Sequence, residues 1–205
     1  MVDDHRILID GLKLLLQGNE NLEIKVEATS AKEMLQLLKD NEVHVLVTDI
    51  MMPGMNGYEL AVEVKNNFPQ IKILALSMNE EGDMITKMIE TAKVDGYIPK
   101  ASGKQELLKA IQSIVSGASY FSLSIIEQYE AYKKIKNENK SLNLTNRELQ
   151  IIECIIKNIS NKEIANKLFI SERTVETHRK NIYRKTDTRG VAGLIEFVKK
   201  HKLLS

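Results

Sequence analysis

The chain has 205 residues, of which 43% are hydrophobic and 28% charged, a composition typical of globular proteins that bury a core. No apolar stretch approaches the roughly 18 residues of a membrane-spanning helix, and no basic and apolar leader opens the chain, so we expect a cytoplasmic protein. The single Cys154 excludes a disulfide within the chain, and its apolar neighbours predict a buried thiol.

Charge is distributed unevenly along the chain. Residues 1–117 hold 12 Lys and Arg against 18 Asp and Glu, whereas residues 118–205 hold 17 against 10. An acidic part can meet a cation or a basic partner, and a basic part can meet a polyanion. We therefore predict two domains, 1–117 and 142–205. The segment 118–141 is weakly helical and ends in the polar run KNENKSLN, which predicts a partly helical linker.

The first 117 residues alternate between helical and strand patterns. An amphipathic helix is predicted over His5–Leu16 with Gly18 as its C-cap, then LEIKVEA as a strand, SAKEMLQLLKD as a helix capped by Ser30, and VHVLVTD as a strand. The same alternation continues through GYELAVEVKNNF, IKILALS, EGDMITKMIETAK, GYIPK and GKQELLKAIQSIVSG. This order predicts a doubly wound α/β domain, in which helices cover both faces of a parallel sheet.

Chemically active side chains stand where these predicted strands end. Asp3 and Asp4 follow the first apolar residues, Asp49 ends VHVLVTD, Ser77 ends ILALS and Lys100 ends DGYIPK. Open parallel sheets place their sites at this edge. Three carboxylates make an oxygen pocket that suits Mg²⁺. With the metal bound, an Asp49 oxygen can attack a phosphoryl group, while Lys100 and the metal stabilise the charge on the equatorial oxygens.

The segments VDDH, VTDIMMPGMNG, LALS and DGYIPK resemble the receiver domain of two-component response regulators, over about residues 2–117. The resemblance implies a five-stranded sheet, Asp49 as the phosphoacceptor, and a sensor histidine kinase as the phosphoryl donor. It also implies that Asp3, Asp4 and the Met51 carbonyl bind Mg²⁺ together with Asp49.

The same resemblance assigns roles to three further side chains. Ser77 is the hydroxyl that moves toward the phosphoryl group, Lys100 is its counter-charge, and Tyr97 is the aromatic switch whose rotamer follows Ser77. This chain differs from many receivers after the lysine, because Ala101 stands where they carry proline.

The strand that leads into the acidic pair is truncated in this sequence. Only Met1 and Val2 precede Asp3, whereas in receivers this strand lies inside the sheet. We therefore expect the Asp3–Asp4 turn to be frayed and the Met1 ammonium to lie close enough to compete with Mg²⁺.

The last third of the chain reads as a series of short capped helices. Thr145 with Glu148 and Ser160 with Glu163 form two capping-box patterns, and Ser171 caps a third, basic helix. Residues 142–205 resemble the helix-turn-helix domain of the LuxR family through LTNREL, SNKEIA and ISERTVETHRKNI. Together with the receiver this is the NarL/FixJ arrangement, a small all-α four-helix domain that binds double-stranded DNA and regulates transcription.

The basic helix, Glu172–Lys185, is predicted to lie in the major groove with Val175 and Ile182 facing inward. On the family pattern, Glu176, Thr177 and Lys180 face base edges. The same pattern assigns phosphate contacts to Lys162, Ser171, Thr174, Arg184 and Lys185.

A homodimer on DNA is expected, because one such helix reads few base pairs. A fourth helix, about 191–201, carries the stripe Val191, Leu194, Ile195 and Val198, which we predict pairs across a two-fold axis. RNA polymerase is a further candidate partner.

Two other readings stay open at this stage. A Mg²⁺-dependent phosphatase of the haloacid dehalogenase type also uses an aspartate at a strand end, but usually has a second aspartate two residues later, where this chain has Met51. A regulator that binds DNA without phosphorylation, with a degenerate receiver, is the other alternative.

Overall fold

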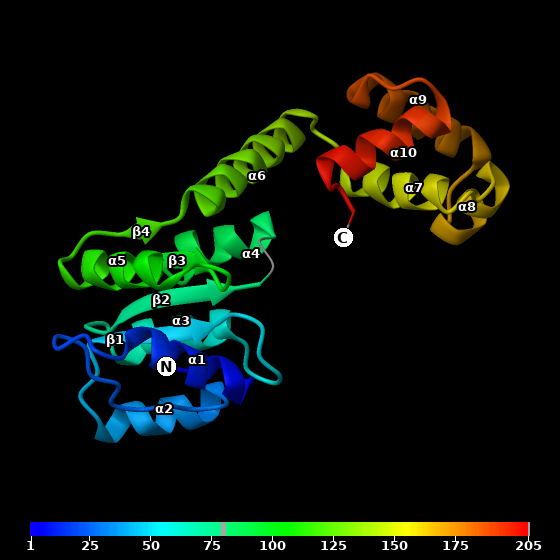
Figure 1. Ribbon diagram of the computed structural model, residues 1–205. Coiled ribbons are helices and arrows are strands. Elements are labelled where there is room, and N and C mark those ends of the chain that lie inside the picture. Colours follow the sequence, from blue (N-terminus) through cyan, green and yellow to red (C-terminus); the bar gives the residue numbers. More distant parts are fainter. Residues whose placement is uncertain (79–80, 205) are drawn as a thin grey trace. The chain divides into compact units, whose positions relative to one another are not determined.

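The computed structural model describes residues 1–78 and 81–204 (Figure 1). The chain divides into two compact units, Met1–Ala131 and a second that begins at Tyr132. Within the described residues, we find no helix with the length and apolar character needed to cross a membrane.

The first unit is built on a parallel sheet in the order β1-β2-β3-β4. The strands are β1 (Val45–Asp49), β2 (Lys72–Ser77), β3 (Gly96–Pro99) and β4 (Tyr120–Phe121). The strands β1, β2 and β3 confirm three strands that the alternating sequence pattern predicted. The short β4 is an addition to the sequence-based prediction, since its two residues lie in the segment that we expected to be a linker.

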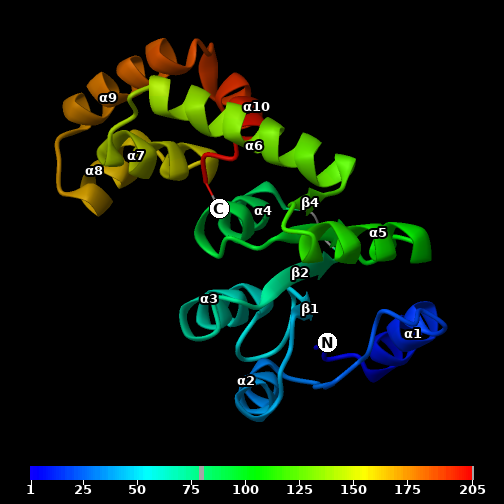
Figure 2. The same ribbon diagram turned by 90° about the vertical axis from the view of Figure 1, so that its left-hand side faces the viewer.

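Helices cover both faces of this sheet, as Figure 2 shows edge-on. One face carries α2 (Ala31–Asp40), α3 (Gly57–Asn67), and α4 (Gly82–Thr86) with the π-helical turn η1 (Lys87–Thr91). The other carries α1 (Arg6–Leu16) and α5 (Lys104–Val115). Successive strand residues enter opposite layers, because side chains of a strand alternate: Ala75 joins the first layer and Leu74 the second. The doubly wound α/β fold is thus confirmed.

The truncated first strand is represented by Val2, which makes parallel bridges to both Ala28 and Thr48. Val2 N donates to Val47 O and Asp49 N donates to Val2 O, both at 2.9 Å, and Asp3 N donates to Ala28 O at 3.3 Å. The expectation of a frayed Asp3–Asp4 turn is therefore wrong, because the backbone that leads into these two residues is hydrogen-bonded to a neighbouring segment on each side.

The strand predicted for LEIKVEA is also wrong, since within it only Ala28 pairs, through its bridge to Val2. A strand needs a partner along its length, and Met1–Asp3 supplies one for Val26 and Ala28 alone. The Met1 ammonium donates to Val26 O at 2.9 Å, and burial lowers the pKa of this amino group to about 6 against the opposing effect of Glu27.

The division between the units falls within α6 (Leu123–Ser141), and the helices that follow are α7 (Asn146–Ile156), α8 (Asn161–Leu168), α9 (Glu172–Thr186) and α10 (Gly190–His201). The three caps expected from the sequence are confirmed. Thr145 and Ser160 both form complete capping boxes, and Ser171 accepts from Thr174 N at 3.1 Å.

The core of this helical unit includes the buried Cys154, as predicted, and the inward-facing Val175 and Ile182 of α9. Leu194 and Val198 of α10 also belong to it, with 0% and 6% exposure. The predicted dimer stripe is therefore wrong as a surface, because half of its members hold α10 onto α7 and α9.

Candidate functional site

The carboxylates expected from the sequence meet at the C-terminal edge of the sheet. Asp3 and Asp49 are buried, at 2% and 3% exposure, and Asp4 is half-buried. Ligand atoms of Asp3, Asp4, His5 and Asp49 all lie within 4.8 Å of one another. We call these four residues the acidic cluster. Sequence reasoning brought three of them together, and tertiary structure confirms their proximity.

Lys100 closes the acidic cluster from the end of β3. Its ammonium lies 2.7 Å from Asp3 Oδ2 and 2.8 Å from Asp49 Oδ2, with only 6% of the side chain exposed. Burial opposes the charge of this ammonium, but hydrogen bonds to Asp3 and Asp49 outweigh it and hold the pKa of Lys100 above its ordinary value. The lysine therefore stays cationic and offsets the repulsion between two buried carboxylates.

One oxygen of the cluster has no hydrogen-bond donor. Asp3 Oδ1 accepts from His5 N at 2.9 Å, whereas Asp4 Oδ1 is buried and has no hydrogen-bond donor. His5 Nδ1 lies 3.0 Å from that oxygen without the geometry of a hydrogen bond. A buried carboxylate oxygen without a donor is costly, and a divalent cation would compensate for it. The donor set thus fits Mg²⁺, a hard ion that prefers oxygen ligands.

His5 is the member of the cluster that the sequence analysis missed. Its ring lies 3.4 Å from Asp3 Oδ1, and its side chain is 63% exposed. Its position in the sequence directly after two carboxylates could have indicated that it joins the cluster.

Two features of the backbone position Asp49. Met51 N donates to Asp49 Oδ1 at 3.2 Å, and Gly57 N donates to Ile50 O at 2.8 Å, which folds the loop back at the start of α3. A Cβ atom on Gly57 would lie 2.0 Å from Asp49 O, so no other residue fits there without movement of the strand end. The loop that ends at Gly57 therefore helps to position the Asp49 carboxylate.

The remaining predicted site residues lie near this edge. Ser77 is buried at the end of β2, and its carbonyl accepts from Lys100 N at 2.8 Å. Tyr97 is fully buried on β3 beside Ala75. The side chain of Met51 is 63% exposed. Only the backbone carbonyl of this residue is predicted to bind the metal.

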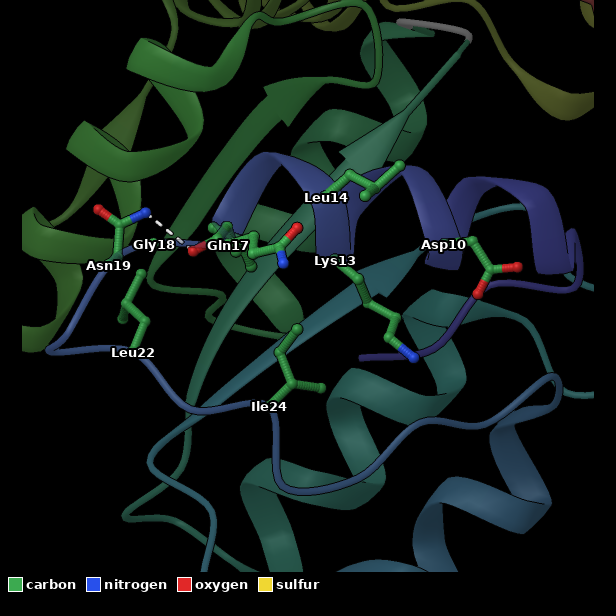
Figure 3. Close-up of a pocket in the computed structure, with 9 residues that line it drawn as sticks. Asp10, Lys13, Leu14, Gln17, Gly18, Asn19, Leu22 and Ile24 are labelled. Carbon is green, nitrogen blue, oxygen red and sulfur yellow. Dashed lines mark hydrogen bonds between the residues drawn. The ribbon is translucent and has the colours of Figure 1, made fainter.

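A pocket in the first unit is separate from the acidic cluster. It measures about 520 Å³ and lies between α1 and the segment that follows it, with Asp10 and Lys13 on one side and Leu22 and Ile24 on the other (Figure 3). Asn19 closes one end through a 2.9 Å hydrogen bond to Leu16 O. None of the predicted site residues lines this pocket.

In the helical unit, α9 presents the polar side chains expected to face base edges. Glu176, Thr177 and Lys180 are all exposed, opposite the buried Val175 and Ile182. Thr177 Oγ1 donates to Arg173 O at 3.0 Å, which orients its methyl group.

The residues expected to contact phosphates differ in their surroundings. Lys162, Ser171 and Arg184 are exposed and Thr174 is half-buried beside Ser171. Lys185 is engaged within the unit, since its ammonium lies 2.7 Å from both Asn143 O and Glu148 Oε2. It would have to leave the buried Glu148 in order to reach a phosphate.

Comparisons with known proteins agree with both units. Residues 1–112 match the family model of the response regulator receiver domain, and residues 142–198 match that of bacterial regulatory proteins of the luxR family. The chain belongs to the response regulators. It is a DNA-binding two-component response regulator, not a conventional enzyme, and it combines a receiver with a LuxR-type helix-turn-helix unit.

Similar proteins cover this response regulator from end to end. It is 32% identical to the transcriptional regulatory protein MctR of Rhizobium johnstonii, over all of this chain and 94% of that protein. It is 29% identical to the fimbriae Z protein of Escherichia coli, over all of this chain and 97% of that protein. A solved structure of RcsB from Salmonella typhimurium has the same fold, with a TM-score of 0.72 over 97% of this chain and 96% of RcsB at 23% identity.

Proposed function

We propose that Asp49 accepts a phosphoryl group from a histidine kinase in a Mg²⁺-dependent reaction, and that this modification controls DNA binding and transcription. The observation that carries the proposal is the placement of Lys100 between Asp3 and Asp49, beside an Asp4 oxygen that has no donor. This arrangement pairs one fixed cation with an oxygen that a second cation would satisfy.

The residues of the acidic cluster have distinct tasks in this proposal. Asp3, Asp4, Asp49 and the Met51 carbonyl would hold Mg²⁺, which when bound supplies positive charge for the phosphoryl oxygens. An Asp49 oxygen attacks phosphorus, an O–P bond forms, and the N–P bond of the phosphohistidine breaks with the electron pair going to the imidazole, which takes up a proton. Lys100 moves from the Asp49 carboxylate to the new phosphoryl oxygens.

The link to the helical unit runs through Ser77 and Tyr97 in our proposal. Ser77 would donate to the phosphoryl group, and Tyr97, now fully buried on the adjacent strand, would change its rotamer with it. Both residues are packed, so the change is between two discrete arrangements rather than a gradual one.

On DNA, we propose that Glu176, Thr177 and Lys180 contact base edges and that Lys162, Ser171, Thr174 and Arg184 contact phosphates. Their exposure on and beside α9 supports these roles. Lys185 belongs to the same predicted set of phosphate contacts. It is the member that would have to break an ion pair, with Glu148, in order to reach a phosphate. A homodimer on DNA is part of the proposal, and a related solved structure describes RcsB as dimers bound to DNA. A cytoplasmic location and contact with RNA polymerase stay predictions of the same proposal.

The deciding experiment is phosphorylation of the full chain by acetyl phosphate, followed by intact-mass measurement. The parent chain should gain one phosphoryl group with Mg²⁺ and none with EDTA, and Asp49→Ala should gain none. Beryllofluoride with Mg²⁺ should raise the affinity for a duplex selected from a random DNA pool. A chain that binds DNA equally well in both states and takes up no phosphate would instead be a regulator with a degenerate receiver.

A further inference from the structure

Phe169 is the most exposed large hydrophobic residue in the described part of the chain. Its side chain is 94% exposed, and it lies at the C-cap of α8, two residues before the Ser171 that caps α9. It therefore stands in the turn of the helix-turn-helix. An isolated exposed apolar side chain needs no explanation by itself, but this one also has an unfavourable backbone.

Phe169 adopts the left-handed conformation, with φ 54° and ψ 47°. Glycine or asparagine is usual at such a cap, because a bulky side chain is strained there. Five other non-glycine residues in the described part of the chain have positive φ, and all are polar: Lys93, Asn143, Asn158, Asp187 and Lys202. Phe169 thus departs from the pattern of its own chain in a direction that costs stability.

The residues around Phe169 prevent the ring from turning inward. Leu168 and Ile170, on either side, both pack on the core of the helical unit. Ile170 N donates to Ala165 O at 3.0 Å, and Arg147 donates to Leu168 O, so the backbone of the turn is held from two directions. The backbone of the turn consequently directs the ring outward.

The surface beside the ring is polar and includes cationic groups. From Asn166 to Arg173, every residue except Leu168 and Ile170 is exposed, and Lys167 and Arg173 are among them. Docking of an apolar protein surface would need a contiguous apolar patch. A single ring on a polar surface that carries Lys167 and Arg173 beside one acidic residue, Glu172, suits the sugars that lie between the phosphates of DNA.

We propose that Phe169 is a further DNA-contacting residue, whose ring packs against deoxyribose at the edge of the major groove that receives α9. This rests on the DNA-binding role of α9 and adds an uncharged contact to it. The left-handed backbone is then the means by which the turn presents a ring outward between two core residues.

The test compares full-length Phe169→Asn, Phe169→Gly and Phe169→Tyr with the parent, on the duplex selected with the parent chain. Asn and Gly accept positive φ, so the melting temperature of the helical unit should rise by about 3 °C or more. DNA binding should nevertheless weaken about tenfold in both variants, with an unchanged salt slope because no charge is removed. Phe169→Tyr, which keeps the ring, should bind like the parent.

Leu123→Asn is the matched control, since it removes a side chain that is 72% exposed in the first unit, and it should leave DNA affinity unchanged. If both Phe169→Asn and Phe169→Gly bound DNA like the parent, the inference would be overturned. It would be overturned equally if these variants kept the parental DNA affinity but changed self-association, because the ring would then contact protein rather than DNA. If the parent chain itself bound no duplex, the DNA-binding function would fail first and this contact with it.

Discussion

At the scale of single residues, the acidic cluster depends on a balance of buried charges. Asp3 and Asp49 are held by one ammonium, that of Lys100, and each side chain of this triad is at most 6% exposed. Removal of one member of a buried ion pair leaves its partners uncompensated, which usually costs more than the pair contributes.

We expect Lys100→Met to lower the free energy of unfolding of the first unit by about 3 kcal/mol when no divalent ion is present. Mg²⁺ should restore part of this loss, because the added cation offsets the same two carboxylates. Thermal unfolding with and without Mg²⁺ measures both effects. The exposed Lys39→Met is the control and should melt like the parent. An equal melting temperature for Lys100→Met and the parent in EDTA would contradict the account of the triad.

A prediction at Gly57 depends on steric contact rather than on charge. Gly57→Ala should destabilise the first unit by about 3 kcal/mol and slow phosphorylation, because its Cβ would displace the carbonyl of Asp49. Urea unfolding and acetyl phosphate labelling test the two parts. Gly11→Ala in α1, with open space around the added methyl group, should neither destabilise the unit nor slow phosphorylation.

At the scale of elements, the start of α7 and the end of α9 are joined by one ion pair. Glu148 is 2% exposed, completes the capping box of Thr145 and lies 2.7 Å from Lys185 Nζ. Burial acts to raise the pKa of Glu148, but the bonds from Lys185 and Thr145 outweigh it and leave that pKa below its ordinary value. The stabilisation is therefore present above the unfolded pKa of about 4.3 and is lost as the pH falls through the folded value.

Glu148→Gln should accordingly lower the stability of the helical unit by about 2 kcal/mol at pH 7, and the difference from the parent should shrink as the pH falls below about 4. Denaturant unfolding followed by helix content across this pH range is the measurement. Glu196→Gln on α10, which is exposed, should match the parent throughout. A gap that stays constant down to pH 3 would show that the ion pair has no part in the effect.

The recognition helix allows base and phosphate contacts to be separated. Lys180→Ala should weaken binding to the selected duplex by about 1–3 kcal/mol while leaving unrelated DNA nearly unaffected. Arg184→Ala should weaken both alike and reduce the salt slope by about 1. Salt titrations of both duplexes measure the difference. Arg184 is the suitable phosphate variant, because Lys185→Ala would also break the ion pair with Glu148. Equal specificity ratios for Lys180→Ala and the parent would remove Lys180 from the base contacts.

At the scale of the whole molecule, the expected assembly is a homodimer on DNA. One recognition helix reads few base pairs, so two half-sites about one helical turn apart, roughly 34 Å, should be protected. Footprinting and sedimentation of the phosphorylated chain measure spacing and stoichiometry. Protection of a single half-site by one chain would contradict the prediction. Leu194→Ala cannot serve as a dimer variant, since that side chain lies in the core of its own unit.

The sequence by itself determined most of the helices and strands, although not the irregular LEIKVEA or the short β4, and it determined the caps of α7, α8 and α9. Period-two runs ending in Asp49 and Ser77, and the capping pairs at Thr145 and Ser160, are local patterns whose outcome depends on neighbouring residues. The position of the site followed as well, because parallel strands place their C-terminal ends at one edge.

Only the tertiary structure decided what depends on contacts between distant segments. Val2 alone holds the place of a strand, through parallel bridges to Ala28 on one side and Thr48 on the other. LEIKVEA does not form a strand because it lacks a longer partner. His5 joins the acidic cluster, and Lys185 turns from a surface cation into the partner of Glu148. Half of the α10 stripe became core because packing, not periodicity, determines which apolar face a neighbouring helix covers.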